Sequence, residues 1–244
     1  MSYKRLGLIG LLMLIGNVTV WCQAAEETRS GVALKKWGHE WNAECEAESY
    51  ITEMGDTLDI VAPMGLTLWR VGRMQSPMEI TYRARVIVNG GAHDRLSDLN
   101  CFWMAKDPKH ADDIMFDSGS RRAVFNRCYA LELYYVGYGG NRNSTTRFRR
   151  YTGDERGIRE KEYRPTVLKE YTDSAHLLKA NHWYEIKITA ESNGRTTYTI
   201  DGETLVDYVD TEPLTEGWYG FRTTHAHVQI TDFRVRELTG ERKR

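Results

Sequence analysis

Two histidines separated by one residue, His225 and His227, form the sharpest chemical feature of the chain. Side chains two apart on a β-strand project to the same side, and Val228 and Ile230 occupy the alternate, core-like positions. We therefore expect both imidazoles to face outward or into a cleft, where either could act as a general base. A metal half-site is less favoured, because no third ligand accompanies the pair at a recognisable spacing. A pair of solvated surface histidines is the structural alternative.

Tyrosines and arginines supply the other groups that β-elimination on an acidic sugar requires. That reaction needs a base, a proton donor for the leaving oxygen, and groups that damp the charge of the sugar carboxylate. With His225 or His227 as the base, Tyr134 or Tyr138 is the expected proton donor. The alternatives are core packing for the tyrosines and solvation or surface ion pairing for the arginines. The predicted substrate-binding residues are Arg83, Arg85, Asp98, Asn100, Asn141, Arg147, Arg149, Arg222 and Trp103.

Short strands separated by turn sequences must position these side chains. Apolar and polar residues alternate over 79–88, whereas 99–105 is apolar on both faces, as in a central strand. An Asn-Gly turn predicts a hairpin between 183–189 and 196–200. No long amphipathic helix period is present, so the chain is predicted to be all-β. Further strands are expected at 57–61, 129–136, 218–223 and 227–235, and long loops at 107–122 and 151–169.

Four stretches resemble a known family. They are GLTLW (65–69), DRLSDLNCFWMAKDP (94–108), YYVGYGGNRNSTTRFRRY (134–151) and GWYGFRTTHAHVQITDFRV (217–235). Together they resemble a domain-of-unknown-function family within the concanavalin A-like lectin/glucanase superfamily, from about Leu34 to Leu238. The resemblance implies a jelly-roll sandwich of two antiparallel sheets with a concave, glycan-facing side, in a Gram-negative bacterium that degrades polysaccharides. It implies no settled activity, because one fold hosts hydrolases, lyases and non-catalytic binders.

Three carbohydrate-related functions remain open for such a fold, beside a purely structural role such as an envelope scaffold. The leading hypothesis is a polysaccharide lyase that acts on an acidic polysaccharide. A non-catalytic glycan-binding module is the first alternative, supported by the many Trp and Tyr residues. A glycoside hydrolase is the second, but it needs two carboxylates, and the Glu-x-Asp-x-x-Glu strand motif of laminarinase-like hydrolases is absent. Its carboxylates would have to come from separate strands, with Asp94, Asp98 and Glu132 as candidates.

The N-terminal sequence predicts export. Lys4 and Arg5 precede an apolar run over 6–20, and small residues flank an expected cut before Ala25. We therefore predict a signal peptide over 1–24 and a single domain over 25–244, with its core at about 34–238, in the periplasm or outside the cell. Lipid attachment through Cys22 is less favoured, because Trp21 is a poor residue before a lipidated cysteine. No later segment is long or apolar enough for a transmembrane anchor.

Charge and cysteine content narrow the partners and cofactors. The formal net charge of −1 argues against nucleic acid and leaves an oligo- or polysaccharide as the expected partner. No cofactor is required by the proposed chemistry, although Asp112, Asp113 and Asp117 could hold a structural calcium ion. Cleavage would leave Cys45, Cys101 and Cys128, an odd number. Cys101 and Cys128 are expected to be buried free thiols, with a single disulfide bridge as the alternative. The oligomeric state is not determined by the sequence.

Overall fold

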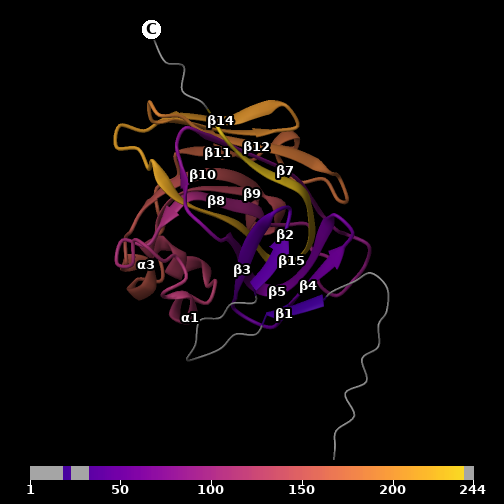
Figure 1. Cartoon of the computed structure of the whole chain (residues 1–244). Helices are drawn as coiled ribbons and strands as arrows, with labels where there is room; N and C mark the ends of the chain where they lie inside the picture. Colours follow the sequence, from indigo (N-terminus) through magenta and orange to yellow (C-terminus); the bar gives the residue numbers. More distant parts are fainter. Residues whose placement is uncertain (1–18, 23–32, 239–244) are drawn as a thin grey trace, which may run out of the picture.

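The structure is a computed structural model, which describes residues 19–22 and 33–238. Antiparallel strands dominate the fold, and the helical elements are short (Figure 1). The strands are β1 (Thr19–Cys22), β2 (Ala33–Lys36), β3 (His39–Cys45), β4 (Ser49–Met54), β5 (Thr57–Arg70), β6 (Met74–Gln75), β7 (Met78–Val86), β8 (Leu99–Lys106), β9 (Glu132–Gly139), β10 (Thr145–Thr152), β11 (Lys169–Tyr171), β12 (Tyr184–Ala190), β13 (Arg195–Ile200), β14 (Glu203–Val209) and β15 (Glu216–Glu237). The helical elements are α1 (Ser118–Arg121), η1 (Phe125–Ala130), α2 (Gly140–Asn143), α3 (Arg156–Arg159) and η2 (Ser174–His176).

Two sheets share the long strands β5 and β15. The front sheet runs in the order β11-β10-β9-β8-β15-β5-β3-β2. The back sheet runs in the order β14-β13-β12-β7-β15-β5-β4-β1. The first half of β15 therefore pairs with β8 and the second half with β7. This confirms the predicted all-β sandwich of two antiparallel sheets.

The main core lies between the two sheets and follows from strand alternation. Buried and partly exposed residues alternate along β7, so that Ile80, Tyr82 and Ala84 point inward. From the front sheet, Trp103, Tyr134 and further alternate residues of β8 and β9 meet them. Apolar area buried in this way contributes about 25 cal/mol per Å² and is the main source of stability.

A second, smaller core lies on the outer face of the front sheet. Phe102, Leu133, Tyr135 and Tyr151 project outward there and pack against residues of η1 and the segment before it. Figure 1 shows α1 and α3 together on this side, next to β8, β9 and β10. The front sheet is thus sandwiched between the main core and a thin layer of loops and single helical turns.

Three sequence-based expectations need correction. Residues 129–131 do not begin a strand, because Tyr129 and Ala130 end the helical turn η1 and the strand starts at Glu132. The segments 218–223 and 227–235 are one strand, since a bulge at Thr224–Ala226 lets β15 continue. The expected loop at 107–122 contains α1, and the expected loop at 151–169 contains α3. Residues 151 and 152 of the second segment still belong to β10, and residue 169 begins β11.

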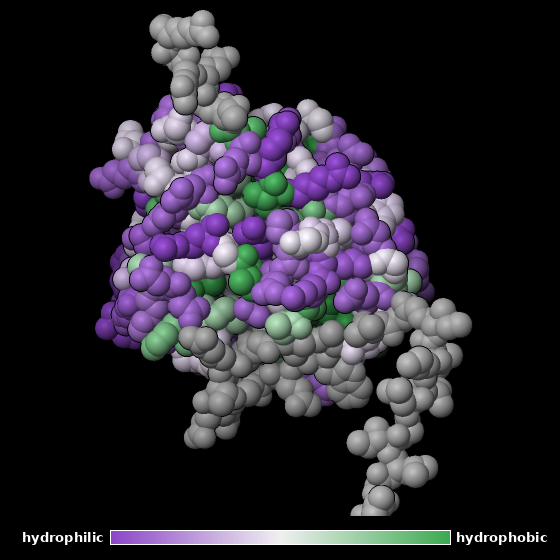
Figure 2. Space-filling view, in the orientation of Figure 1, coloured by the Kyte–Doolittle hydropathy of each residue, from purple (hydrophilic) through white to green (hydrophobic). Residues whose placement is uncertain are grey.

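The surface seen in Figure 2 is mostly hydrophilic, with apolar residues scattered singly rather than gathered in one patch. Cys101 and Cys128 are buried and free, as predicted, whereas Cys45 is disulfide-bonded. Most of the predicted signal peptide, and the cleavage position before Ala25, lie outside the described residues; β1 is the part that is described, and it pairs with β4. Over residues 19–22 and 33–238, no helix combines the length and apolar character that a membrane crossing requires.

Candidate functional site

A groove of about 490 Å³ opens on the outer face of the front sheet. Strands β8, β9, β10 and β15 form its floor, and α2, η1 and the loop before β8 contribute to its walls. Its charged lining is strongly cationic, with six arginines and two acids: Arg95, Arg142, Arg147, Arg149, Arg164, Arg222, Glu46 and Asp98.

Strand register brings residues that are distant in sequence into one row on the groove floor. Arg222 of β15 is opposite Asn100 of β8, and Asn100 is opposite Gly137 of β9. Gly137 is in turn opposite Arg147 of β10. Directly opposed residues share a face of the sheet, so these four positions line up across four strands.

Tyr135 leans over the gap that Gly137 leaves in this row. It belongs to the next row, between Phe102 of β8 and Arg149 of β10. A Cβ atom on Gly137 would lie 2.2 Å from the Tyr135 hydroxyl oxygen, so the absence of a side chain admits the hydroxyl into the row of Asn100 and Arg147. Burial raises the pKa of Tyr135, because the phenolate would lose its hydration. The hydroxyl is therefore protonated at neutral pH and available as a donor.

Two arginines of the groove floor are buried without a carboxylate. Arg222 is 1% exposed and Arg149 is 6% exposed. Arg222 donates to neutral acceptors, the Thr67 hydroxyl at 3.2 Å and the Ala123 carbonyl at 2.9 Å. Among the described residues, neither guanidinium has a carboxylate within ion-pair distance, and the Nε atom of each is buried with no hydrogen-bond partner. A buried cation is costly unless a negative group offsets it, so the groove is suited to an anionic ligand.

The two acids of the groove are already engaged. Asp98 accepts hydrogen bonds from Arg95 at 3.1 Å and from Asn100 Nδ2 at 3.2 Å. The Glu46 carboxylate accepts the backbone N–H of Gly65 at 3.2 Å. Their hydrogen bonds hold the groove walls, which argues against their use as a free catalytic carboxylate pair.

The groove contains six of the predicted substrate-binding residues. They come from the loop before β8, from β8 itself, from α2, from β10 and from β15. Only strand pairing brings them together, since the sequence separates the first and last by more than a hundred positions. They are Asp98, Asn100, Asn141, Arg147, Arg149 and Arg222.

Three predicted residues face the main core instead. The Tyr134 hydroxyl donates to Asp210 at 2.7 Å, and the Tyr138 hydroxyl donates to the Leu177 carbonyl at 3.3 Å. Trp103 is fully buried, and its indole N–H donates to Thr196 at 2.9 Å. The structure therefore does not bring these side chains into the groove, because they have the opposite strand parity from Asn100 and Tyr135.

Arg83 and Arg85 lie on the outer face of the back sheet. Their guanidinium carbons lie 5.4 and 4.6 Å from the ring centroid of Trp183. Arg85 also donates to Gln229 at 2.8 Å, and Arg83 lies 3.9 Å from Asp232. They do not line the groove.

The two histidines differ in environment. His225 is exposed, with a φ of 48° at the bulge, so the simple alternation expected across 225–227 does not hold. His227 lies between two carboxylates, 2.9 Å from Asp94 and 2.9 Å from Asp59. Neither histidine lines the groove.

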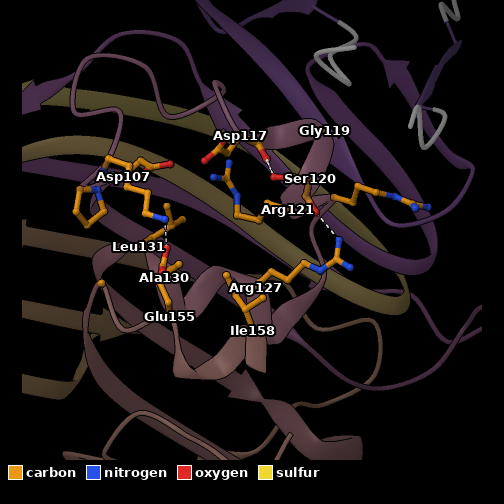
Figure 3. A pocket seen from close by; sticks show the side chains of 14 residues that line it. Asp107, Asp117, Gly119, Ser120, Arg121, Arg127, Ala130, Leu131, Glu155 and Ile158 are labelled. Carbon is orange, nitrogen blue, oxygen red and sulfur yellow. Dashed lines mark hydrogen bonds and ion pairs between the residues drawn. The ribbon is translucent and has the colours of Figure 1, made fainter. Parts of the chain in front are cut away.

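A larger cavity of about 760 Å³ lies on the far side of η1 (Figure 3). In this view Asp117, Gly119 and Ser120 form one wall, and Glu155 and Ile158 lie opposite. Its charges are largely satisfied within the protein, since Lys109 pairs with Glu155 and Arg127 donates to the Ser120 carbonyl. We therefore consider the arginine-rich groove the stronger candidate.

The three aspartates suggested for calcium have other contacts. Asp112 pairs with Arg73 at 3.3 Å, and Asp113 accepts the backbone N–H of Met115 at 3.0 Å. Asp117 lies 3.4 Å from His110. Within residues 19–22 and 33–238, no three His, Cys, Asp or Glu side chains are grouped as metal ligands.

Sequence reasoning missed several groove residues. The sequence pattern does not distinguish Tyr135 from Tyr134, because tyrosines occupy both faces of the strand, and Gly137 is the residue that marks the groove face. The others lie in loops or helical turns, or at the bulge of β15, where no periodicity indicates which way a side chain points. They are Glu46, Arg95, Phe125, Tyr129, Arg142, Arg164 and Thr224.

Comparison with known proteins identifies a family and a fold. A family described as "Domain of unknown function (DUF6250)" matches residues 60–233. A search of curated proteins found no match. The family match supports the resemblance to a domain-of-unknown-function family that the sequence suggested.

Solved structures share the fold at low sequence identity. A Bacillus subtilis protein of unknown function with a galectin-like fold has a TM-score of 0.61 at 16% identity, covering 81% of this chain and 89% of that chain. The exoplasmic/lumenal domain of VIP36, in a Ca²⁺/mannose-bound form, has a TM-score of 0.55 at 12% identity, covering 84% and 85%. The carbohydrate recognition domain of Emp46p, in a metal-free form, has a TM-score of 0.52 at 10% identity, covering 82% and 89%. At these identities the likeness concerns the fold alone.

Proposed function

We propose that this chain, which belongs to the DUF6250 family, is an exported carbohydrate-active protein that binds an acidic polysaccharide in the arginine-rich groove. The observation that carries the proposal is the pair of buried cations, Arg149 and Arg222, that no carboxylate neutralises among the described residues. A uronic acid would supply the missing negative charge through its carboxylate and would use its hydroxyls to reach the polar groups of the floor. Lectin-type relatives of the fold, such as the mannose-bound VIP36 domain, support a sugar as the ligand class.

Calorimetric titration with a uronic-acid hexasaccharide and its carboxyl-reduced, neutral counterpart tests the proposal. We expect binding of the acidic sugar only. Arg149→Gln should weaken binding by at least about tenfold, because a charge-assisted hydrogen bond contributes about 1.5–3 kcal/mol. Arg164→Gln, at an exposed rim position, should weaken it about two- to fivefold, as expected for a surface charge worth up to about 1 kcal/mol.

Arg159→Gln is the matched control, because Arg159 is also exposed but does not line the groove. Equal affinity for the acidic and the neutral hexasaccharide would refute the proposal. So would an Arg159→Gln effect as large as that of Arg164→Gln, since general charge attraction would then explain the binding.

The second candidate function is cleavage of the bound polysaccharide by β-elimination. A base removes the proton from C5, the C4–O bond breaks as the C4=C5 double bond forms, and the leaving oxygen takes up a proton. Its support is the protonated Tyr135 hydroxyl at Gly137, in the row of Asn100 and Arg147. In this scheme Tyr135, rather than Tyr134 or Tyr138, is the proton donor.

Product analysis separates binding from cleavage. A lyase yields oligosaccharides with a C4=C5 double bond conjugated to the carboxyl group, which absorb in the ultraviolet. Tyr135→Phe should keep the affinity and lose this product, whereas Tyr138→Phe, altered on the opposite face, should retain it. New reducing ends without unsaturation would indicate a hydrolase, and binding without any product would indicate a glycan-binding module.

A further inference from the structure

We infer that His227 is a positioning residue for the groove: its imidazolium fastens the β7–β8 loop (residues 87–98), which supplies Arg95 and Asp98 to the groove, onto β5 and β15. The inference rests on the proposed function only for its ligand-binding readout. The attachment itself is a property of the fold and can be measured without a ligand.

The contacts of His227 require both of its ring nitrogens to donate. Nδ1 lies 2.9 Å from an oxygen of Asp94, and Nε2 lies 2.9 Å from an oxygen of Asp59. Neutral imidazole has one donor, whereas imidazolium has two, so only the charged ring satisfies both carboxylates. In agreement, the hydrogen bond to Asp59 raises the pKa of His227 despite partial burial, and Asp94 acts in the same direction.

Asp94 connects this histidine to the groove. Its second oxygen accepts the backbone N–H of Asn89 at 2.8 Å and of Gly91 at 3.0 Å, which closes the turn at the start of the loop. The next residue, Arg95, donates to the Thr224 carbonyl at 3.1 Å and also to Asp98. Loss of one His227 hydrogen bond therefore loosens the segment that presents Arg95 to the ligand.

Charged groups around His227 explain why the neutral ring would hold the loop poorly. Asp59 on β5 also accepts a hydrogen bond from Gln229 at 2.6 Å, and Gln229 accepts one from Arg85 on β7. His225, on the same strand, is exposed. When His227 is neutral, two carboxylates face an uncharged ring. Arg85 then remains as a nearby cation, and Gln229 links it to Asp59 by hydrogen bonds.

The pH window follows from the directions of the shifts. The pKa of His227 is raised in the folded protein. The stabilisation that His227 gives to the loop attachment is therefore complete below the unfolded pKa of about 6.5 and is lost as pH rises through the folded pKa. Burial pushes the pKa of Asp59 and Asp94 upward, but hydrogen bonds outweigh it and lower both. The stabilisation that the two carboxylates give to the attachment is present above a pH of about 3.9 and is lost as pH falls through their pKa values in the folded protein. The attachment is strongest between these limits.

Affinity for the uronic-acid hexasaccharide, measured from pH 5.5 to 9 at constant ionic strength, tests the inference. No histidine lines the groove among the described residues, and burial raises the pKa of Tyr129 and Tyr135, so the groove itself should not titrate in this range. We expect the affinity to fall on the order of fivefold with rising pH in the wild type. The His227→Gln and Asp94→Asn variants should bind weakly at all pH values and lose this pH dependence.

Amide hydrogen exchange over residues 87–98 provides the measurement that needs no ligand. Exchange should be faster in His227→Gln than in the wild type at pH 6, and the difference should shrink at pH 9. His176→Gln is the control, because His176 also lies between two carboxylates, Asp173 and Glu203, and does not line the groove. An unchanged pH profile and unchanged loop exchange in His227→Gln would overturn the inference. Faster exchange without binding of the hexasaccharide at any pH would support the attachment and reject the groove function.

Discussion

Replacing Gly137 with alanine should close the groove without removing any of its polar groups. The added Cβ would lie 2.2 Å from the Tyr135 hydroxyl oxygen and 2.7 Å from Cζ of its ring. The backbone at Gly137 does not have the positive φ that disfavours alanine, so the collision with Tyr135 is the cause of any effect.

The structure indicates how far Tyr135 must move. An ordinary contact begins at 3.4 Å, so the hydroxyl has to shift by about 1.2 Å, the difference between 3.4 and 2.2 Å. The ring is hemmed in by Phe102, Phe125 and Tyr151, whose centroids lie 5.5, 5.6 and 5.7 Å away. It can therefore escape only toward the groove, into space that a ligand would occupy.

We expect the collision in Gly137→Ala to cost about 1–3 kcal/mol in total. Part of this cost lowers the free energy of unfolding, and the rest weakens the free energy of binding. A 1.4 kcal/mol share in binding would weaken the uronic-acid hexasaccharide about tenfold. Calorimetric titration and thermal unfolding of the variant measure the two parts.

Gly140→Ala is the matched control in the same groove. Its Cβ would meet its nearest neighbour, the Thr145 carbonyl, at 3.8 Å, an ordinary contact. If Gly137→Ala bound the sugar as tightly as Gly140→Ala and unfolded at the wild-type temperature, the placement of Tyr135 over Gly137 would be refuted.

Two further predictions concern buried groups. Glu44→Gln should lower the free energy of unfolding by about 3–5 kcal/mol in chemical denaturation, because it leaves the Arg121 guanidinium, 2.7 Å away, buried without a counter-charge; Glu40→Gln, at an exposed pair with Lys35, should change it by less than about 1 kcal/mol. Cys101 should react with a thiol reagent only upon unfolding, since burial raises its pKa to about 12. Labelling of Cys101, located by mass spectrometry, in the native protein at pH 8 would contradict this.

Sequence patterns predicted β7 and β8 well, because the surroundings of the two faces of each strand match its pattern of apolar residues. β7 alternates between buried and partly exposed residues throughout, as the sequence pattern over 79–88 requires. β8 is apolar without a period and is buried on both faces, because the main core lies on one side and the outer layer on the other. At Tyr129 and Ala130 a short apolar stretch forms a helical turn. Periodicity cannot distinguish a strand from a helical turn over so few residues.

Only part of the candidate site could be predicted from the sequence, for a similar reason. Arg147 and Arg149 could be identified because both follow a turn and share one strand parity. Tyr135 could not be separated from Tyr134, since the direction in which β9 faces depends on its pairing with β8 and β10. The bulge at His225 likewise shifts the parity of every residue after it, and no local sequence pattern reports a bulge.

Buried arginines in the outer layer differ in whether a carboxylate pairs with them, and this difference bears on function. Arg121 has its carboxylate, Glu44, which also accepts hydrogen bonds from Trp69 and from the backbone of Ala123. Arg222 is as deeply buried and also contacts Ala123, yet its acceptors there are a hydroxyl and a carbonyl. The fold can therefore place a carboxylate beside a buried arginine in this region, and it does not do so at the groove floor. Proteins tolerate such an uncompensated charge mainly where a ligand completes it, so the absence of a carboxylate beside Arg222 among the described residues favours an acidic ligand over a purely structural role.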